Sequence, residues 1–123
     1  MRVIGIDPGL TRCGIGVVDS NGPQKLNLID VGIIKTDPDA ELDQRLLHLE
    51  IELSKWIKKY KPDVIAIEDI IQFMGGKSTA NTIITLTAFN RMIALLAYDW
   101  LKKPPYLYSV MKIRHGLKNK ILP

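Results

Sequence analysis

The sequence has a single cysteine among its 123 residues and few aromatic residues. One cysteine, Cys13, excludes an internal disulfide framework and a multi-cysteine zinc site, and it is typical of a protein from a reducing cytoplasm. No apolar run approaches the roughly 18 residues that a membrane span requires, so we expect no membrane association. The N-terminus has no charged leader followed by a long apolar stretch, so we expect no signal peptide.

Acidic residues are scarce in the second half of the chain. Residues 1–69 carry nine Lys/Arg and twelve Asp/Glu, a net charge of −3. Residues 70–123 carry eight Lys/Arg and only Asp99, a net charge of +7. A carboxylate-bearing half joined to a basic half fits a protein that holds cations in one place and meets a polyanion in another. A basic surface that meets only solvent explains the charge equally well.

Apolar residues are abundant enough for one globular domain covering residues 1–123. They make up 46% of the chain, against 24% charged residues, which is an ordinary composition for such a domain. Apolar runs bounded by turn residues predict strands over residues 2–7, 14–19, 25–36 and 64–68, with a short fifth strand over residues 106–110. The apolar positions of the third strand are Leu26, Leu28, Val31, Ile33 and Ile34.

Two long helices are predicted between these strands. Asp37 as N-cap and Pro38 as first helical residue start the first helix, and Pro62 follows its end. Its apolar stripe consists of Leu42, Leu46, Leu49, Leu53 and Trp56. Ser78 or Thr79 caps a second helix that runs to about Trp100, and a third begins over residues 111–116. The order β-β-β-α-β-α-β predicts an α/β fold, with a mixed sheet of five strands flanked by helices.

Two acidic residues lie at the ends of predicted strands, each where a loop begins. Asp7 follows the apolar run of residues 3–6, and Glu68 follows the run of residues 64–67. If these strands are parallel neighbours, both carboxylates lie at the same edge of the sheet. A hard divalent cation such as Mg²⁺ or Mn²⁺ suits such a pair. The alternative, that Asp7 is a turn residue and Glu68 a solvated acid, has about equal weight on the residues alone.

Two segments resemble the RuvC family of Holliday junction resolvases. The run GIDPGLTRCGIGVVD, residues 5–19, is similar to the opening strand-turn-strand of that family, in which the Asp is a catalytic metal ligand. The run KPDVIAIE, residues 61–68, is similar to the family's second acidic strand, whose terminal Glu is also a ligand. The meander between the two runs and the long helix after them agree with the family, and the similarity covers essentially the whole chain.

The resemblance implies an RNase H-like fold and a function. It implies hydrolysis of a phosphodiester in four-way DNA junctions, in recombination and repair, with Asp7 and Glu68 as catalytic residues that hold two Mg²⁺ or Mn²⁺ ions. No serine or cysteine nucleophile is then needed, and Cys13 is interpreted as a packing residue. The resemblance also implies a cytoplasmic homodimer that binds branched DNA and works with a helicase that moves the junction.

Further residues are candidates for DNA and dimer contacts. Phe73, in the loop over residues 72–77, is a candidate for stacking on a base, with an ordinary core contact as an equal alternative. Candidate phosphate contacts are Lys77, Arg91, Lys112, Arg114, Lys118 and Lys120. In the family the helix after the Glu strand forms most of the dimer contact, which implies interface roles for Leu86, Phe89 and Ile93. The alternative is that this helix is buried on two faces of the monomer.

One part of the family's pattern is missing from this sequence. The family's active site needs four carboxylates, two of them in an Asp-x-x-Asp arrangement on a C-terminal helix, but Asp99 is the only acid after Asp69. We therefore expect little or no cleavage by these 123 residues. Two interpretations follow: a fragment of a longer nuclease, which we favour, or a shortened relative that binds junctions without cutting. A YqgF-like RNA-processing nuclease and a non-catalytic DNA-binding module also fit the sequence.

Overall fold

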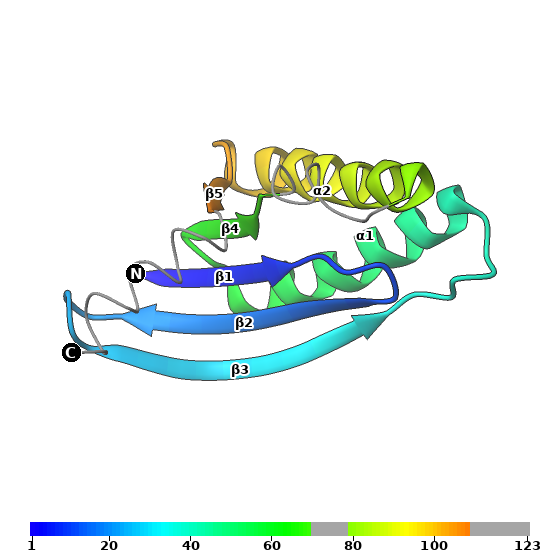
Figure 1. Cartoon of the computed structure of the whole chain (residues 1–123). Helices are drawn as coiled ribbons and strands as arrows, with labels where there is room; N and C mark the ends of the chain where they lie inside the picture. Colours follow the sequence, from blue (N-terminus) through cyan, green and yellow to red (C-terminus); the bar gives the residue numbers. More distant parts are fainter. Residues whose placement is uncertain (70–78, 109–123) are drawn as a thin grey trace, which may run out of the picture.

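The structure, a computed structural model, describes residues 1–69 and 79–108. Five strands form one sheet in the order β3-β2-β1-β4-β5 (Figure 1). Their bounds are Arg2–Asp7 for β1, Arg12–Ser20 for β2, Leu26–Lys35 for β3, Val64–Glu68 for β4 and Tyr106–Tyr108 for β5. The strands β1, β2 and β3 pair antiparallel, whereas β4 pairs parallel with both β1 and β5. This confirms the predicted mixed α/β sheet, with a meander followed by parallel crossovers.

Two helices, α1 (Leu42–Tyr60) and α2 (Ala80–Leu101), share one core with the sheet. Alternate residues of β1 and β4, such as Ile4 and Ile65, are buried there. The helices contribute Leu49 and Leu53 from α1 and Phe89, Ile93 and Leu96 from α2. All these side chains belong to one cluster, so both helices cover the same face of the sheet.

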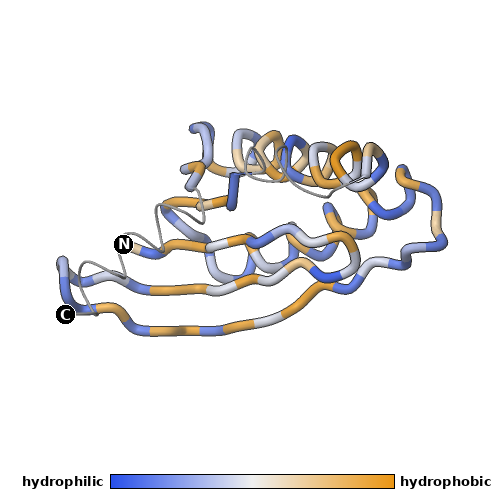
Figure 2. Tube along the Cα trace, viewed as in Figure 1, coloured by the Kyte–Doolittle hydropathy of each residue, from blue (hydrophilic) through white to orange (hydrophobic). Residues whose placement is uncertain are grey.

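The third strand carries an exposed row of apolar residues. Of its five predicted apolar positions only Ile34 is buried, and the other four, Leu26, Leu28, Val31 and Ile33, are exposed. Val31 pairs with Gly16 and Leu28 with Val18, on the face of the sheet opposite the helices. Figure 2 shows apolar residues along much of this edge strand. The strand itself was predicted correctly, but its apolar residues do not mark the core.

The first helix begins later than predicted. It starts at Leu42 with Glu41 as N-cap, so the prediction of Asp37 as N-cap and Pro38 as first helical residue is wrong. The Asp37 carboxylate instead accepts a hydrogen bond from the Asp39 amide at 2.9 Å, and the Ala40 amide donates to the Asp37 carbonyl. Asp37 therefore closes a turn before the helix, which is the other structure that an Asp-Pro pair favours.

The second helix confirms Thr79, one of its two predicted caps, and corrects two expectations. The Thr79 hydroxyl accepts a hydrogen bond from the Thr82 amide at 3.2 Å, as expected for an N-cap.

This helix of 22 residues is long and apolar enough to cross a membrane by length and composition alone, contrary to the expectation that no run approaches that length. Core helices also pass that test, and Leu86, Phe89 and Ile93 of α2 are buried in the chain's own core. The assignment of these three residues to a dimer interface is therefore wrong.

Gly32 of β3 is required by the packing of α1. A Cβ at this position would lie 2.4 Å from Cζ2 of Trp56, whereas a Cβ at Gly16 would meet nothing within 4 Å. We expect Gly32→Ala to lower the free energy of unfolding by about 1–3 kcal/mol through overpacking. Gly16→Ala is the matched control on the neighbouring strand and should be neutral or slightly stabilising. Urea unfolding of both variants measures the difference, and equal stability would contradict this packing.

Candidate metal site

Strand register places Asp7 and Glu68 side by side. In the parallel pair of β1 and β4, Gly5 lies opposite Ala66 and Ile6 opposite Ile67, so Asp7 and Glu68 come next at the carboxyl ends. Ile6 and Ile67 are buried on the helix side, and alternation directs the following two side chains to the other face. Asp7 is exposed, whereas Glu68 is only 9% exposed. The two carboxylates that the sequence singled out therefore share one edge and one face of the sheet.

The turn after Asp7 is tightly held. A Cβ at Gly9 would lie 2.4 Å from the carbonyl oxygen of Arg12, so only glycine fits there. The Thr36 hydroxyl donates to the Leu10 carbonyl at 3.1 Å, and the Thr36 amide donates to the Thr11 carbonyl at 2.9 Å. The Arg45 guanidinium of α1 also donates to the Leu10 carbonyl. These bonds fix the path of the chain immediately after the first carboxylate.

The chain around Glu68 is held by α2 and β5. The side-chain amide of Asn90 donates to the Glu68 carbonyl at 3.0 Å, and the Asp69 amide donates to the Tyr108 carbonyl. Tyr108 lies opposite Glu68 in the register of β4 and β5. Its hydroxyl is 3.5 Å from the Ile6 carbonyl oxygen, so its side chain crosses toward β1. Tyr108 thus lies against both carboxylate-bearing strands.

The electrostatics of neighbouring groups reflect two nearby negative charges. Burial raises the pKa of the Tyr108 hydroxyl, and the charges of Glu68 and Asp7 raise it further. Burial, with a smaller contribution from Asp7, raises the pKa of the Cys13 thiol to about 12. Cys13 is fully buried beside this edge, so it is a packing residue, as its sequence context indicated.

The Cys13 thiol is expected to be unreactive in the folded protein. Its raised pKa keeps it protonated near pH 8, and only the thiolate attacks a disulfide reagent. Labelling with Ellman's reagent should be negligible for the folded chain and complete after unfolding in guanidinium. The unfolded thiol loses its proton at lower pH than the folded one, so Cys13 should reduce stability as pH rises above about 8.5. Prompt labelling of the folded chain at pH 8 would contradict its burial.

Two carboxylates suit a divalent cation but do not complete its site. Mg²⁺ and Mn²⁺ prefer oxygen ligands, and Asp7 and Glu68 supply them from rigid neighbouring strands. Within residues 1–69 and 79–108, no group of three or more His, Cys, Asp or Glu residues could hold a metal ion. Asp7 and Glu68 therefore supply about half of the carboxylate ligands of a two-metal centre.

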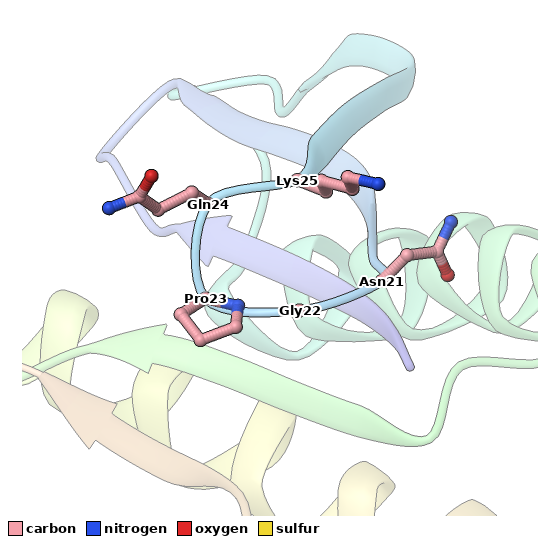
Figure 3. A pocket seen from close by; sticks show the side chains of 5 residues that line it. All are labelled: Asn21, Gly22, Pro23, Gln24 and Lys25. Carbon is pink, nitrogen blue, oxygen red and sulfur yellow. The ribbon is translucent and has the colours of Figure 1, made fainter.

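A surface hollow elsewhere carries no comparable chemistry. It is formed by the turn between β2 and β3, where five consecutive residues surround it (Figure 3). Those residues are Asn21, Gly22, Pro23, Gln24 and Lys25. The turn lies beside the N-terminus, because the Ser20 amide donates to the Met1 carbonyl. It is therefore at the end of β1 opposite to Asp7.

The predicted DNA contacts fall mostly outside the described residues. Phe73, Lys77, Lys112, Arg114, Lys118 and Lys120 lie there. Arg91 is exposed on α2, and its Nε donates to the Asn90 side-chain oxygen at 3.0 Å.

Sequence reasoning missed three residues around the site: Asn90, Arg45 and Tyr108. A detectable sign existed for Asn90 alone, because it is a polar residue within the apolar stripe of α2, four positions after Leu86.

Comparison with known proteins identifies the family. The family model of the crossover junction endodeoxyribonuclease RuvC matches residues 3–113. The chain belongs to the RuvC family. The RuvC of Pseudarthrobacter chlorophenolicus is 39% identical over 98 residues, which are 76% of this chain and 51% of that protein. The RuvC of Corynebacterium glutamicum is 38% identical over 117 residues, which are 95% of this chain and 51% of that protein.

A solved RuvC structure has the same fold. The chain superimposes on Thermus thermophilus RuvC in complex with Holliday junction substrate with a TM-score of 0.83 at 24% identity. The match covers 97% of this chain and 69% of that one. These results confirm the predicted RNase H-like fold and the predicted family. The chain spans about half the length of the first two RuvC relatives.

Proposed function

We propose that this chain is the carboxylate-bearing part of a metal-dependent endonuclease that binds and resolves four-way DNA junctions. The observation that carries the proposal is the position of Asp7 and Glu68, each directly after the paired residues Ile6 and Ile67 at the ends of two parallel strands. Membership of the RuvC family supports the reaction, because the relatives are named as crossover junction endodeoxyribonucleases. The chemistry is hydrolysis of a phosphodiester by water.

The chain's own residues would hold and aim the reacting groups. When bound, a pair of Mg²⁺ or Mn²⁺ ions supplies the activation of water and the stabilisation of charge on the phosphate. Asp7 and Glu68 provide oxygen ligands from strands whose backbones are fixed by the sheet. Gly14 lies opposite Asp7 and has no side chain, which leaves that side of the carboxylate open. The buried Cys13 thiol takes no part as a nucleophile.

Branched DNA is the proposed substrate. The solved Thermus thermophilus relative is described in complex with a Holliday junction. In this chain residues 70–123 carry a net charge of +7, which suits a phosphate backbone. We assign phosphate contacts to Arg91 on α2 and to Lys77, Lys112, Arg114, Lys118 and Lys120, and base stacking to Phe73.

A homodimer through α2 is part of the same proposal, with a different set of residues. Ile84, Leu95 and Tyr98 are exposed and recur at helical spacing along one side of α2. None of the three belongs to the core that buries Leu86, Phe89 and Ile93. A dimer would place two carboxylate sites on one junction. A cytoplasmic location and a helicase partner complete the proposal.

Junction binding and cleavage test the proposed function. The chain should retard a synthetic four-way DNA junction more strongly than duplex DNA of the same sequence, with the steep salt dependence of phosphate contacts. Asp7→Asn should leave this binding intact. Cleavage by the unchanged chain with Mn²⁺ should be weak or absent, because the described residues bring only two carboxylates together at this edge. Equal affinity for duplex and junction would contradict the proposal. Preference for structured RNA would favour a YqgF-like nuclease instead.

A further inference from the structure

Among the described residues, Asn90 is the one side-chain amide in the apolar interior between α2 and the sheet. Asn90 is 1% exposed, and residues of the core such as Phe89 and Ile93 lie beside it on the same helix. A buried amide is costly unless its hydrogen bonds are made, so its partners show what it contributes. Its two polar atoms are both bonded: Nδ2 donates to the Glu68 carbonyl at 3.0 Å, and Oδ1 accepts from Nε of Arg91 at 3.0 Å.

The bond from Asn90 reaches the residue that carries the second carboxylate. Glu68 is the last residue of β4, where the strand's own pairing ends. Its carbonyl and its side chain leave from the same residue, so a bond that fixes the carbonyl also limits how the carboxylate is aimed. Asn90 approaches from the helix side, whereas alternation places the Glu68 side chain on the other face. Asn90 can therefore orient the ligand without occupying its site.

The residue before Asn90 supports the first carboxylate. The Arg45 guanidinium lies 5.3 Å from the centre of the Phe89 ring, within the range of a cation–π contact. The same guanidinium donates to the Leu10 carbonyl, three residues after Asp7, and lies 3.4 Å from the Thr36 hydroxyl. Two consecutive residues of α2 thus act on the two strand ends. Asn90 bonds the Glu68 carbonyl directly. Phe89 contacts the Arg45 guanidinium, which bonds the turn after Asp7.

We propose that Asn90 is a positioning residue that holds Glu68 beside Asp7. Arg45, which lies over the Phe89 ring, holds the turn after Asp7 in the same way. This inference rests on the proposed cation site. Groups that orient metal ligands from behind typically change metal affinity by about 10–100-fold when removed. We therefore predict that loss of Asn90 weakens cation binding, in addition to any effect on the stability of the core.

The test compares affinity for Mn²⁺ alone with thermal stability in four variants. Asn90→Leu keeps the number and branching of the side-chain heavy atoms but removes the amide donor and acceptor. We expect its Kd for Mn²⁺ to rise about tenfold. Leu96→Ala, on the same helix and buried away from the site, is the control: its Tm should fall at least as far while its Kd stays within about twofold of the wild type. Arg45→Met, at a half-buried position, should also weaken Mn²⁺ binding and carries the test if Asn90→Leu does not fold.

Asp7→Asn distinguishes a failure of the proposed cation site from a failure of the role proposed for Asn90. If wild-type binding of Mn²⁺ is absent, or is the same in Asp7→Asn, the proposed cation site itself is wrong. If binding depends on Asp7 but is unchanged in folded Asn90→Leu, Asn90 is only a core residue and the positioning role is overturned. A weakening in Asn90→Leu that Leu96→Ala matches would also overturn it, because general loosening of the core would then explain the effect.

Discussion

Replacement of Asp7 by Asn is expected to raise the Kd of the chain for Mn²⁺ at least tenfold. Asp7 and Glu68 are the two carboxylates that the sheet brings together, so the variant loses half of the site's charge and one of its strong oxygen ligands. The amide that replaces the carboxylate has nearly the same shape, and Asp7 is exposed, so the fold should be retained. Isothermal titration of both proteins with MnCl₂ measures the change.

Asp43→Asn is the matched control for this experiment. Asp43 lies in the first turn of α1 and is exposed, so its removal changes the net charge by the same amount. Its Kd for Mn²⁺ should stay within about twofold of the wild type, because exposed charges that are far apart interact weakly in salt. If both variants lose affinity equally, Mn²⁺ is held by the general charge of the protein and Asp7 is not a ligand.

Replacement of Phe89 by Ala is expected to destabilise the chain by about 3–5 kcal/mol. Its ring is fully buried among residues of both helices and the sheet, and it also supports the Arg45 guanidinium. Truncation leaves a cavity where the helices meet the strands. The free energy of unfolding from urea titration measures the loss.

Leu95→Ala, on the exposed side of the same helix, should change stability by about 0.5 kcal/mol or less in dilute protein. Leu95 is 63% exposed, and its neighbour in the exposed row, Tyr98, is exposed as well. If α2 forms the proposed dimer through this row, Leu95→Ala should reduce the dependence of Tm on protein concentration, whereas Phe89→Ala should lower Tm at every concentration. Equal destabilisation by both changes in dilute protein would contradict the burial pattern of α2.

The sequence was sufficient to predict the mixed sheet and the carboxylate pair because both depend on short, strong patterns. Apolar β-branched runs that end in an acid place Asp7 and Glu68 at strand ends, and two parallel neighbours then bring them together. Local hydrogen bonding also predicted that Ser78 or Thr79 caps α2, and Thr79 is the cap. These features need no knowledge of what packs against them.

Other features depend on tertiary contacts, and sequence reasoning failed there. Apolar residues of β3 such as Val31 are exposed because both helices cover the other face of the sheet, and periodicity does not report which face is covered. The apolar residues of α2 were divided wrongly between core and interface for the same reason. Arg45 lies outside the predicted apolar stripe of α1, yet its guanidinium reaches the turn after Asp7. Such contacts join residues far apart in the chain and leave no local pattern.

The central claim, that Asp7 and Glu68 are ligands at the same cation site, is tested most directly by mapping where Mn²⁺ binds. Paramagnetic broadening of backbone amide signals during a Mn²⁺ titration reports every residue near the ion. We predict that amides of residues 6–7 and 67–69 broaden together at the same low Mn²⁺ concentration, and that both sets stay sharp in Asp7→Asn. Broadening confined to one strand end, or centred on the acidic turn at Asp37 and Asp39, would contradict the claim.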